Sequence, residues 1–156
     1  MVKEGIPFVI VPAFIAVLFV LFGLWPVGVV FILLALFMAY FFRDPQRTVP
    51  AGDDIIVSAD GRVTRIDQTP DATTVSVFLS PFDVHINRSP IAGKVEGIEY
   101  IRGKKAPATS DEASFSNERN SLVLANDKMT VTCTQIAGIV ARRIVCWARP
   151  GDQLEL

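Results

Sequence analysis

The sequence predicts an all-β soluble domain, built as a sandwich or a partly open barrel, that follows an N-terminal transmembrane helical hairpin. Of the 156 residues, the 38 residues 5–42 carry no charge, whereas the 114 residues 43–156 hold 29 of the 31 charged side chains. A break that contains proline and glycine divides the apolar run. Short runs rich in Val, Ile, Thr and Phe, separated by turn residues, make up much of the rest, as in β domains.

The apolar run is long enough for two membrane helices. A hydrocarbon core is crossed by about 20 apolar helical residues. A single helix over the whole run would reach roughly 57 Å. Pro26 lacks a backbone donor and disfavours helical geometry at Trp25, and a glycine lies on either side of this break. We therefore predict helices over about 6–24 and 28–42, with residues 1–42 as the membrane anchor.

The charges that flank the hairpin predict its orientation. Lys3 precedes the apolar run, and Arg43 and Arg47 follow it. Because positive charge favours the cytoplasmic side, both termini are expected there, with the soluble domain on the cytoplasmic face of the cell membrane. A cleavable signal peptide is the alternative. Its apolar core would run about 7 to 15 residues before a cleavage site, whereas here the apolarity continues.

Composition argues against several classes of protein. With 15 basic and 16 acidic side chains the net charge is −1, and nothing suggests a nucleic-acid partner. Cys133 and Cys146 lie in no CxxC motif and beside no histidine, so no metal site is predicted. In a reducing compartment both cysteines would remain thiols.

Residues 43–156 are predicted to form one β-rich domain. No segment after residue 50 shows a helical period of useful length. One polar stretch, 102–116, is too long for an ordinary connection between strands. The candidate strands are 55–57, 62–66, 73–79, 94–101, 121–125, 129–136 and 139–147.

The only histidine is the first candidate for chemistry. His85 follows Asp83 by two residues, so in an extended segment both side chains would share one face. A carboxylate so placed could orient the imidazole. The ordinary interpretation, a surface or half-buried histidine beside a turn, is the more frequent one for such spacing. Asp60 is the second candidate, although an Asp-Gly pair is first of all a turn signal.

Other charged residues have ordinary interpretations as well. Glu118 and Arg119 lie in NERN, 117–120, where a solvated ion pair is the default. Arg43 at the membrane surface could hold a lipid phosphate, although anchoring of the helix end is the simpler role.

Five segments, taken together and in this order, resemble those of a known protein family, although no single residue among them is specific to it. They are FFRDPQR at 41–47, VSADGRV at 57–63, FLSPFDVHINRSP at 78–90, NERN at 117–120 and IAGIVARRI at 136–144. Together they resemble the short form of phosphatidylserine decarboxylase, including its relatives that act on archaetidylserine. The hydrophobic N-terminal hairpin is similar to the anchor of that family.

The resemblance implies a membrane-bound carboxy-lyase that removes the carboxylate of a serine phospholipid headgroup and leaves ethanolamine. Such enzymes carry a covalent pyruvoyl group, made when a zymogen cuts itself at a serine. The larger fragment is the β chain, and the small α chain bears the pyruvoyl group. A protein has no side chain that delocalises the carbanion left by loss of CO2, and the pyruvoyl carbonyl supplies that electron sink.

The resemblance also implies roles for individual residues. Asp60 and His85 would be the acid and base that activate the cleaving serine, and His85 would then act in proton transfer during decarboxylation. Asp83 would be the supporting carboxylate. Headgroup or loop contacts are the expectation for Arg88, Asn117, Glu118 and Arg119.

Two departures from the family pattern matter. Longer members have a second histidine where this sequence has Arg88. The cleavage serine of the family follows a glycine, and this sequence contains no Gly-Ser pair. We therefore expect a β chain or a truncated proenzyme, active only with a C-terminal α chain that completes the sheet and carries the pyruvoyl serine.

The sequence is compatible with further partners and functions. A homo-oligomer is compatible with the sequence, and the lipid tails could be acyl or isoprenoid chains. The alternatives to an active enzyme are a membrane-anchored adaptor with a lipoyl-like domain and an inactive paralogue that binds phospholipid. An adaptor would make no use of His85.

Overall fold

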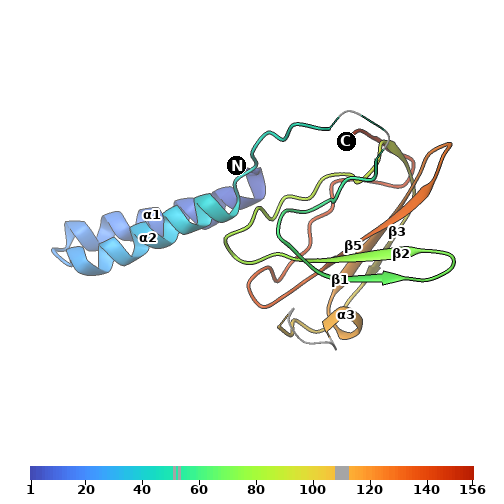
Figure 1. Ribbon diagram of the computed structural model, residues 1–156. Coiled ribbons are helices and arrows are strands. Elements are labelled where there is room, and N and C mark those ends of the chain that lie inside the picture. Colours follow the sequence, from blue (N-terminus) through green and yellow to red (C-terminus); the bar gives the residue numbers. More distant parts are fainter. Residues whose placement is uncertain (51, 53, 108–112) are drawn as a thin grey trace.

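The computed structural model describes residues 1–50, 52, 54–107 and 113–156 of the chain. A helical hairpin projects from a β-rich domain (Figure 1). A 3-10 turn, η1 (Lys3–Gly5), leads into α1 (Ile6–Leu21), and α2 (Trp25–Phe41) returns beside it.

Both predicted helices are present, but the break between them is displaced. Gly23 occupies the turn with a φ of 76°, in the left-handed region that glycine enters without strain. Pro26 lies inside the first turn of α2 and does not end a helix. The predicted start at residue 28 is therefore wrong, because a proline in the first helical turn loses no intrahelical hydrogen bond.

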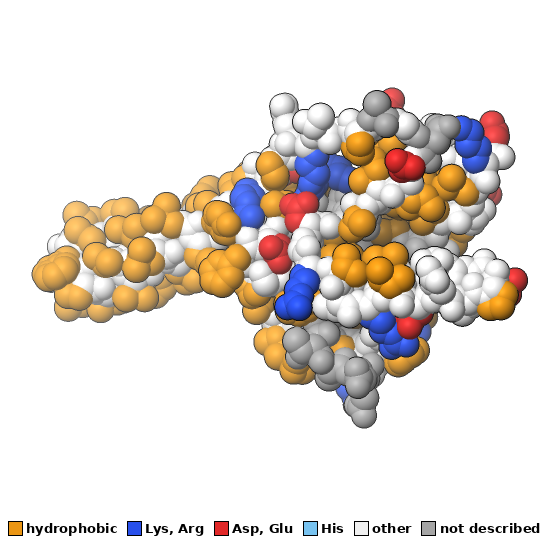
Figure 2. Space-filling view, in the orientation of Figure 1, with side chains coloured by type: hydrophobic (Ala, Val, Ile, Leu, Met, Phe, Trp, Pro, Cys, Tyr) orange, Lys and Arg blue, Asp and Glu red, His pale blue; other side chains and the backbone are white. Residues whose placement is uncertain are grey.

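The two helices pack closely through small residues and leave large apolar side chains outside. Ala16 and Ala35 are buried, and the rings of Phe19 and Phe31 stack with centroids 5.6 Å apart. Apolar side chains cover the visible face of the hairpin, while the charged side chains gather on the β domain (Figure 2). By length and composition the helical stretch Lys3–Leu21, with 19 residues and mean hydropathy 2.4, is able to cross a bilayer, and α2 is shorter. Such an exposed apolar surface is unusual for a protein in water.

The described strands form two antiparallel sheets, which confirms the predicted β-rich domain and adds the direction of its strands. β1 (Arg62–Gln68) and β2 (Thr73–Phe78) make a two-stranded ribbon. The second sheet has the order β5 (Thr130–Ile136), β4 (Arg119–Ala125), β3 (Gly93–Ile101) and β6 (Gln153–Leu154). Within the described residues no strand pairing joins the two sheets, so these strands do not close a barrel.

The core lies against one face of the larger sheet. Ile91, Val95 and Leu124 are its fully enclosed members. Alternate residues of β4 are buried, as expected when one face of a strand packs inward. Partly buried apolar side chains surround this cluster, namely Ile98, Met129, Val131, Ala148 and Leu154.

Two predicted strands are absent, and one strand was missed. Residues 55–57 are extended but unpaired as a strand, with Ile56 N–H donating to the Pro90 carbonyl at 2.9 Å. Residues 139–147 form bends and coil, although their composition favours strand. Strand propensity reflects packing against a neighbouring strand, and these runs find none in the described chain. The short β6 carries no β-rich run, and its pairing with β3 is decided by tertiary contact.

The long polar stretch also contains structure that the sequence did not predict. A short helix, α3 (Ala113–Ser116), and an isolated parallel bridge between Lys104 and Asn117 lie within or beside it. The part of that stretch at 108–112 lies outside the described residues.

Candidate active site

His85 and Asp83 lie in the connection between β2 and β3, where the chain turns and does not continue as a strand. Asp83 N–H donates to the Ser80 carbonyl at 2.9 Å, and Ser80 N–H donates to Oδ2 of Asp83 at 2.7 Å. The bond from Ser80 N–H to the carboxylate, and then a bond from the Ser80 side chain, hold the pKa of Asp83 below its ordinary value. The carboxylate of Asp83 therefore closes a turn, so the expected arrangement on one strand face is wrong.

The imidazole of His85 is oriented by a backbone group. Its Nδ1 lies 3.1 Å from the carbonyl oxygen of Asp83. Since a carbonyl only accepts hydrogen bonds, Nδ1 carries the proton in this contact and Nε2 keeps its lone pair. Burial lowers the pKa of His85, against the opposing effects of the Asp83 carbonyl and the Asp83 charge. The neutral imidazole is thus favoured, with Nε2 able to accept a proton.

The last turn of α2 covers this segment. The ring of Phe41 stacks on the imidazole of His85 with centroids 4.1 Å apart and an interplanar angle of 28°. Phe37 meets Phe82 edge to face at 6.2 Å. The base of the hairpin and the histidine therefore form one packed unit.

Arg43 ties the end of α2 to the same turn. Its Nη2 donates to the Phe82 carbonyl at 2.8 Å, and its Nη1 donates to the Tyr40 carbonyl at 2.9 Å. The guanidinium carbon lies 3.7 Å from the centroid of the Tyr40 ring, within cation–π range. These contacts support the anchoring interpretation of Arg43.

Asp60 lies at the start of the β1–β2 ribbon and reaches the His85 segment through Arg47. Gly61 has a φ of 127°, and a side chain there would collide with the Phe78 carbonyl, so this turn requires glycine. Nη2 of Arg47 donates to Oδ2 of Asp60 at 3.1 Å and to the Ile86 carbonyl at 3.0 Å. One nitrogen thus connects Asp60 to the residue that follows His85.

Arg47 and Phe41 contact the candidate site residues, although neither is predicted from the sequence. The sequence marks Arg47 only as a positive charge after the hairpin, within the FFRDPQR segment that resembles the family. Neither the spacing of 13 residues to Asp60 nor that of 39 to Ile86 gives a local signal. The tertiary structure alone brings these groups together.

Arg88 adds a further link among the same segments. Its Nη2 forms an ion pair with Oδ1 of Asp44, and its backbone N–H donates to the Ser58 carbonyl at 2.9 Å. The Sγ atom of Cys133 in β5 lies 3.4 Å from Oγ of Ser58. Arg88 therefore helps to hold the chain that leaves the hairpin, the Asp60 turn and the His85 segment against the larger sheet.

The NERN residues belong to a different cluster. Asn117 is fully buried, donates to the carbonyls of Ala106 and Ala137 at 2.9 Å each, and accepts from Ala106 N–H at 3.0 Å. Arg119 donates to the Phe115 carbonyl at 2.8 Å. These bonds hold neighbouring loops together.

Glu118 is also buried in that cluster. A hydrogen bond from Tyr100, and then the charge of Lys105 at 3.5 Å, lower the pKa of Glu118, while the same carboxylate raises the pKa of Tyr100. In the part of the chain that the structure describes, no hydrogen bond or ion pair joins Asn117, Glu118 or Arg119 to Asp60 or His85.

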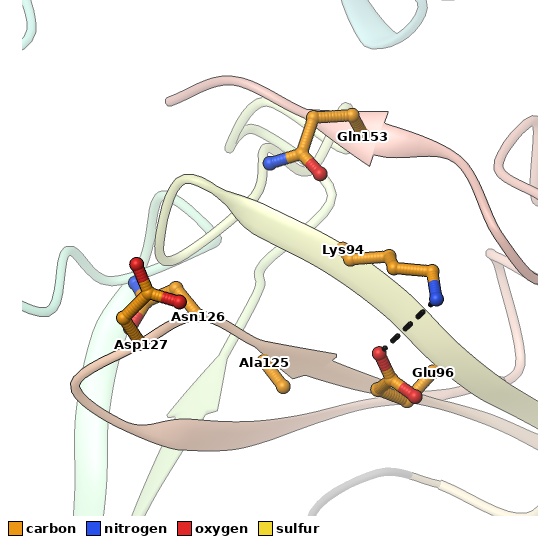
Figure 3. Close-up of a pocket in the computed structure, with 6 residues that line it drawn as sticks. All are labelled: Lys94, Glu96, Ala125, Asn126, Asp127 and Gln153. Atoms are coloured by element: carbon orange, nitrogen blue, oxygen red, sulfur yellow. Dashed lines mark ion pairs between the residues drawn. The ribbon is translucent and has the colours of Figure 1, made fainter.

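Surface hollows and metal ligands do not add to the His85 site. A polar hollow of about 380 Å³ lies beside the β4–β5 turn and β6, with Lys94 and Glu96 paired at 3.6 Å (Figure 3). It contains none of the candidate residues. Across the described residues, no group of three or more His, Cys, Asp or Glu side chains is placed to hold a metal ion.

The chain matches one protein family over most of its length. The family model described as phosphatidylserine decarboxylase matches residues 34–156. A phosphatidylserine decarboxylase proenzyme of Solibacter usitatus is 45% identical over 136 residues, which cover 85% of this chain and 67% of the relative. The proenzyme of Symbiobacterium thermophilum is 46% identical over 162 residues, covering 98% and 75%. That of Burkholderia ambifaria is 44% identical over 165 residues, covering 97% and 75%.

Proposed function

The chain belongs to the phosphatidylserine decarboxylase family, and we propose that it acts, through a proenzyme, to remove the serine carboxylate of phosphatidylserine as CO2 and leave the ethanolamine phospholipid. The observation that carries this proposal is the identity of about 45% to named proenzymes over most of the chain. A lipoyl-like adaptor is not favoured, because these relatives are named as decarboxylases.

His85 is the proposed base. Nδ1 is engaged by the Asp83 carbonyl, so Nε2 is free to take the proton of a serine hydroxyl during self-cleavage. The same atom can pass a proton to or from the reacting carbon during decarboxylation. The lowered pKa supports this role, because a base must be unprotonated at the working pH.

Asp60 is the proposed second member of the pair. Its carboxylate is anchored by Arg47, which also binds the Ile86 carbonyl. The ion pair is partly exposed, with 44% of the Asp60 side chain accessible, so the carboxylate can still meet a reacting group. Asp83 supports the turn that presents His85.

The pyruvoyl group, when bound, supplies an electron sink for the carbanion left by loss of CO2. The residues beside His85 fit a partner segment there. Within the described chain, Nη1 of Arg47 and Oδ1 of Asn87 are buried without a hydrogen-bond partner. A donor and an acceptor left open around Ile86 can bind polar groups of the α chain, and Arg47 and Asn87 would hold that segment.

The larger sheet also has room for an added strand. β6 pairs only with Gly93 and Lys94 of β3, and beyond Val95 no described strand pairs with that edge. Unpaired strand edges favour pairing with a further chain. This supports an α chain that completes the sheet.

Membrane attachment through the hairpin places the site near the lipid headgroups. The His85 segment is packed against the last turn of α2. Arg88 is the nearby cation proposed to meet the headgroup phosphate, in exchange for its partner Asp44, while Arg43 holds the end of α2. The tails, acyl or isoprenoid, would remain in the bilayer.

The proposed cytoplasmic orientation has its own test. Cys146 is exposed on the β domain. A membrane-impermeant maleimide should label it in lysed cells and leave it unlabelled in intact cells. Labelling in intact cells, absent in a Cys146→Ser variant, would contradict the cytoplasmic orientation.

The function is tested on the full-length gene product in membranes. Vesicles with phosphatidylserine labelled in the serine carboxylate should release labelled CO2, and intact mass spectrometry should find two fragments, the smaller with an N-terminal pyruvoyl. His85→Gln should remain one uncut chain. A single fragment with no carbonyl in the wild type, together with no CO2 release, would overturn the proposal and favour a phospholipid-binding paralogue.

A further inference from the structure

The base of the hairpin touches the proposed catalytic histidine directly. Phe41 ends α2 and is 7% exposed. Its ring lies over the His85 imidazole at a centroid distance of 4.1 Å, which is close for two stacked rings. A helix that served only as an anchor would need no such contact.

The last turn of α2 is itself held in place on the domain. Phe37 packs against Phe82, and Arg43 donates to the Phe82 carbonyl. At the other side of the hairpin base, Nε1 of Trp147 donates to Oε1 of Glu4 at 3.0 Å. The position of Phe41 relative to His85 is therefore determined by several independent contacts.

Two contacts together define the direction of the imidazole. The Asp83 carbonyl binds the Nδ1 edge, and this bond alone leaves the ring free to tilt about it. Phe41 covers one face and removes that freedom. With both contacts present, Nε2 points in one direction.

We propose that Phe41 is a positioning residue for His85, so that the membrane hairpin is part of the catalytic machinery as well as an anchor. The inference rests on the role proposed for His85. It assigns to the end of α2 the task of holding Nε2 toward the group that gives up its proton. Misplacement of a reacting group by about 1 Å can cost 10²-fold in rate.

The same stacking keeps water from the imidazole. The charged groups that face His85 are Asp83 from its own segment and Arg43 from the end of α2, and they act in opposite directions on its pKa. Loss of the Phe41 ring would expose the imidazole and bring its pKa back toward the ordinary value.

The test compares two hairpin phenylalanines in the full-length proenzyme in membranes. Phe41→Leu removes the ring over His85. The matched control is Phe31→Leu, which removes the ring stacked on Phe19 within the hairpin and leaves the His85 segment untouched. Phe41→Tyr keeps an aromatic ring and tests for rescue. The rate of self-cleavage, kcat and KM are measured as functions of pH. In parallel, NMR follows the signal of the His85 imidazole, which is identified by its absence in His85→Gln.

We expect Phe41→Leu to slow self-cleavage and lower kcat by about 10- to 100-fold with KM little changed, and to move the acidic limb of the pH profile upward. Phe31→Leu should match the wild type in all these readouts, and Phe41→Tyr should restore most of the rate. Equal effects of the two leucine variants, or no rescue and no shift of the profile, would overturn the inference. If His85→Gln itself cleaves and turns over normally, the proposed role of His85 fails instead.

Discussion

Arg47 and Asp60 form a half-buried ion pair in which Nη2 lies 3.1 Å from Oδ2. Because the same nitrogen also binds the Ile86 carbonyl, the pair connects the chain leaving the hairpin, the turn before β1 and the segment of His85. A carboxylate and a histidine that are 25 positions apart in the sequence thus share one scaffold.

Asp60→Asn should impair self-cleavage more than stability. The amide keeps the shape of the side chain but loses the charge, and a partly exposed ion pair such as this one contributes only about 1 kcal/mol to folding. We expect cleavage to slow by at least about 10²-fold, as for loss of an acid or base. Time courses on denaturing gels measure the cleavage. Asp67→Asn, which breaks an exposed ion pair with Arg65 on β1, is the control and should cleave normally.

In a plot of the self-cleavage rate against pH, the fall in rate on the acidic side should lie below pH 6.5. The neutral imidazole is the active base, and burial lowers the pKa of His85, so the rate should stay on its plateau through pH 6.5 and fall only at more acidic pH. In the unfolded chain the His85 imidazole takes up a proton near pH 6.5, whereas in the folded chain it does so only at lower pH. Stability should therefore decrease as pH falls below 6.5 toward the lowered pKa. A limb above pH 6.5 would contradict a buried base.

Asp83 should contribute stability at neutral pH that disappears in acid. Its pKa is lowered in the folded state, so the ionised form stabilises the fold above the ordinary value of 3.8, and the contribution is lost as pH falls through the lowered pKa. Chemical denaturation of wild type and Asp83→Asn at pH 7 and near pH 2 measures it. The two proteins should differ at pH 7 and converge in acid, and a constant difference would argue against the turn contact.

Asn117→Ala should destabilise the β domain but leave the proposed reacting groups at the His85 site in place. The change removes all three hydrogen bonds of a fully buried side chain, two to the part-buried Ala106 and one to the buried Ala137 carbonyl, at a cost of about 3 kcal/mol. Asn126→Ala is the matched control, since exposed Asn126 also makes three such bonds and water can replace them. Denaturation midpoints should fall far more for Asn117→Ala. Loss of substrate binding at unchanged stability would instead support a headgroup contact.

A lysine in the hairpin should weaken membrane attachment. Val17 is 56% exposed in the second half of α1, and a charge inside a membrane helix costs up to about 2.5 to 3.5 kcal/mol, the value at the helix centre. Val17→Lys should move protein from the membrane fraction to the soluble or aggregated fraction. Val63→Lys, at a similarly exposed position of β1, should not change the distribution. An unchanged distribution for Val17→Lys would argue against a buried hairpin.

Much of the fold could be predicted because its signals are local. The uncharged run 5–42 and the β-rich runs at 62–66, 73–79, 94–101 and 129–136 became helices and strands. The runs at 55–57 and 139–147 have the same composition but no paired neighbour in the described chain, and they are not strands. Strand formation depends on a partner, and composition cannot report whether that partner exists.

The candidate site divides in the same way. His85 and Asp60 could be proposed from the order of five segments, but the sequence did not show which group of Asp83 meets the imidazole. In the structure the Asp83 carboxylate binds Ser80 while its carbonyl binds His85, because a turn replaces the expected extended segment. Arg47 and Phe41 were not proposed, since neither has a local pattern that points to His85.

By itself the sequence determined that an uncharged hairpin precedes a β domain of a decarboxylase family, because apolar runs, turn residues and the order of the five segments can be recognised along the chain. Only the tertiary structure decided that Phe41 covers the His85 imidazole and that Arg47 links Asp60 to Ile86, the residue after His85. Stacking and ion pairing act over a few ångströms in space, between residues 13 to 44 positions apart, and no sequence spacing encodes that approach.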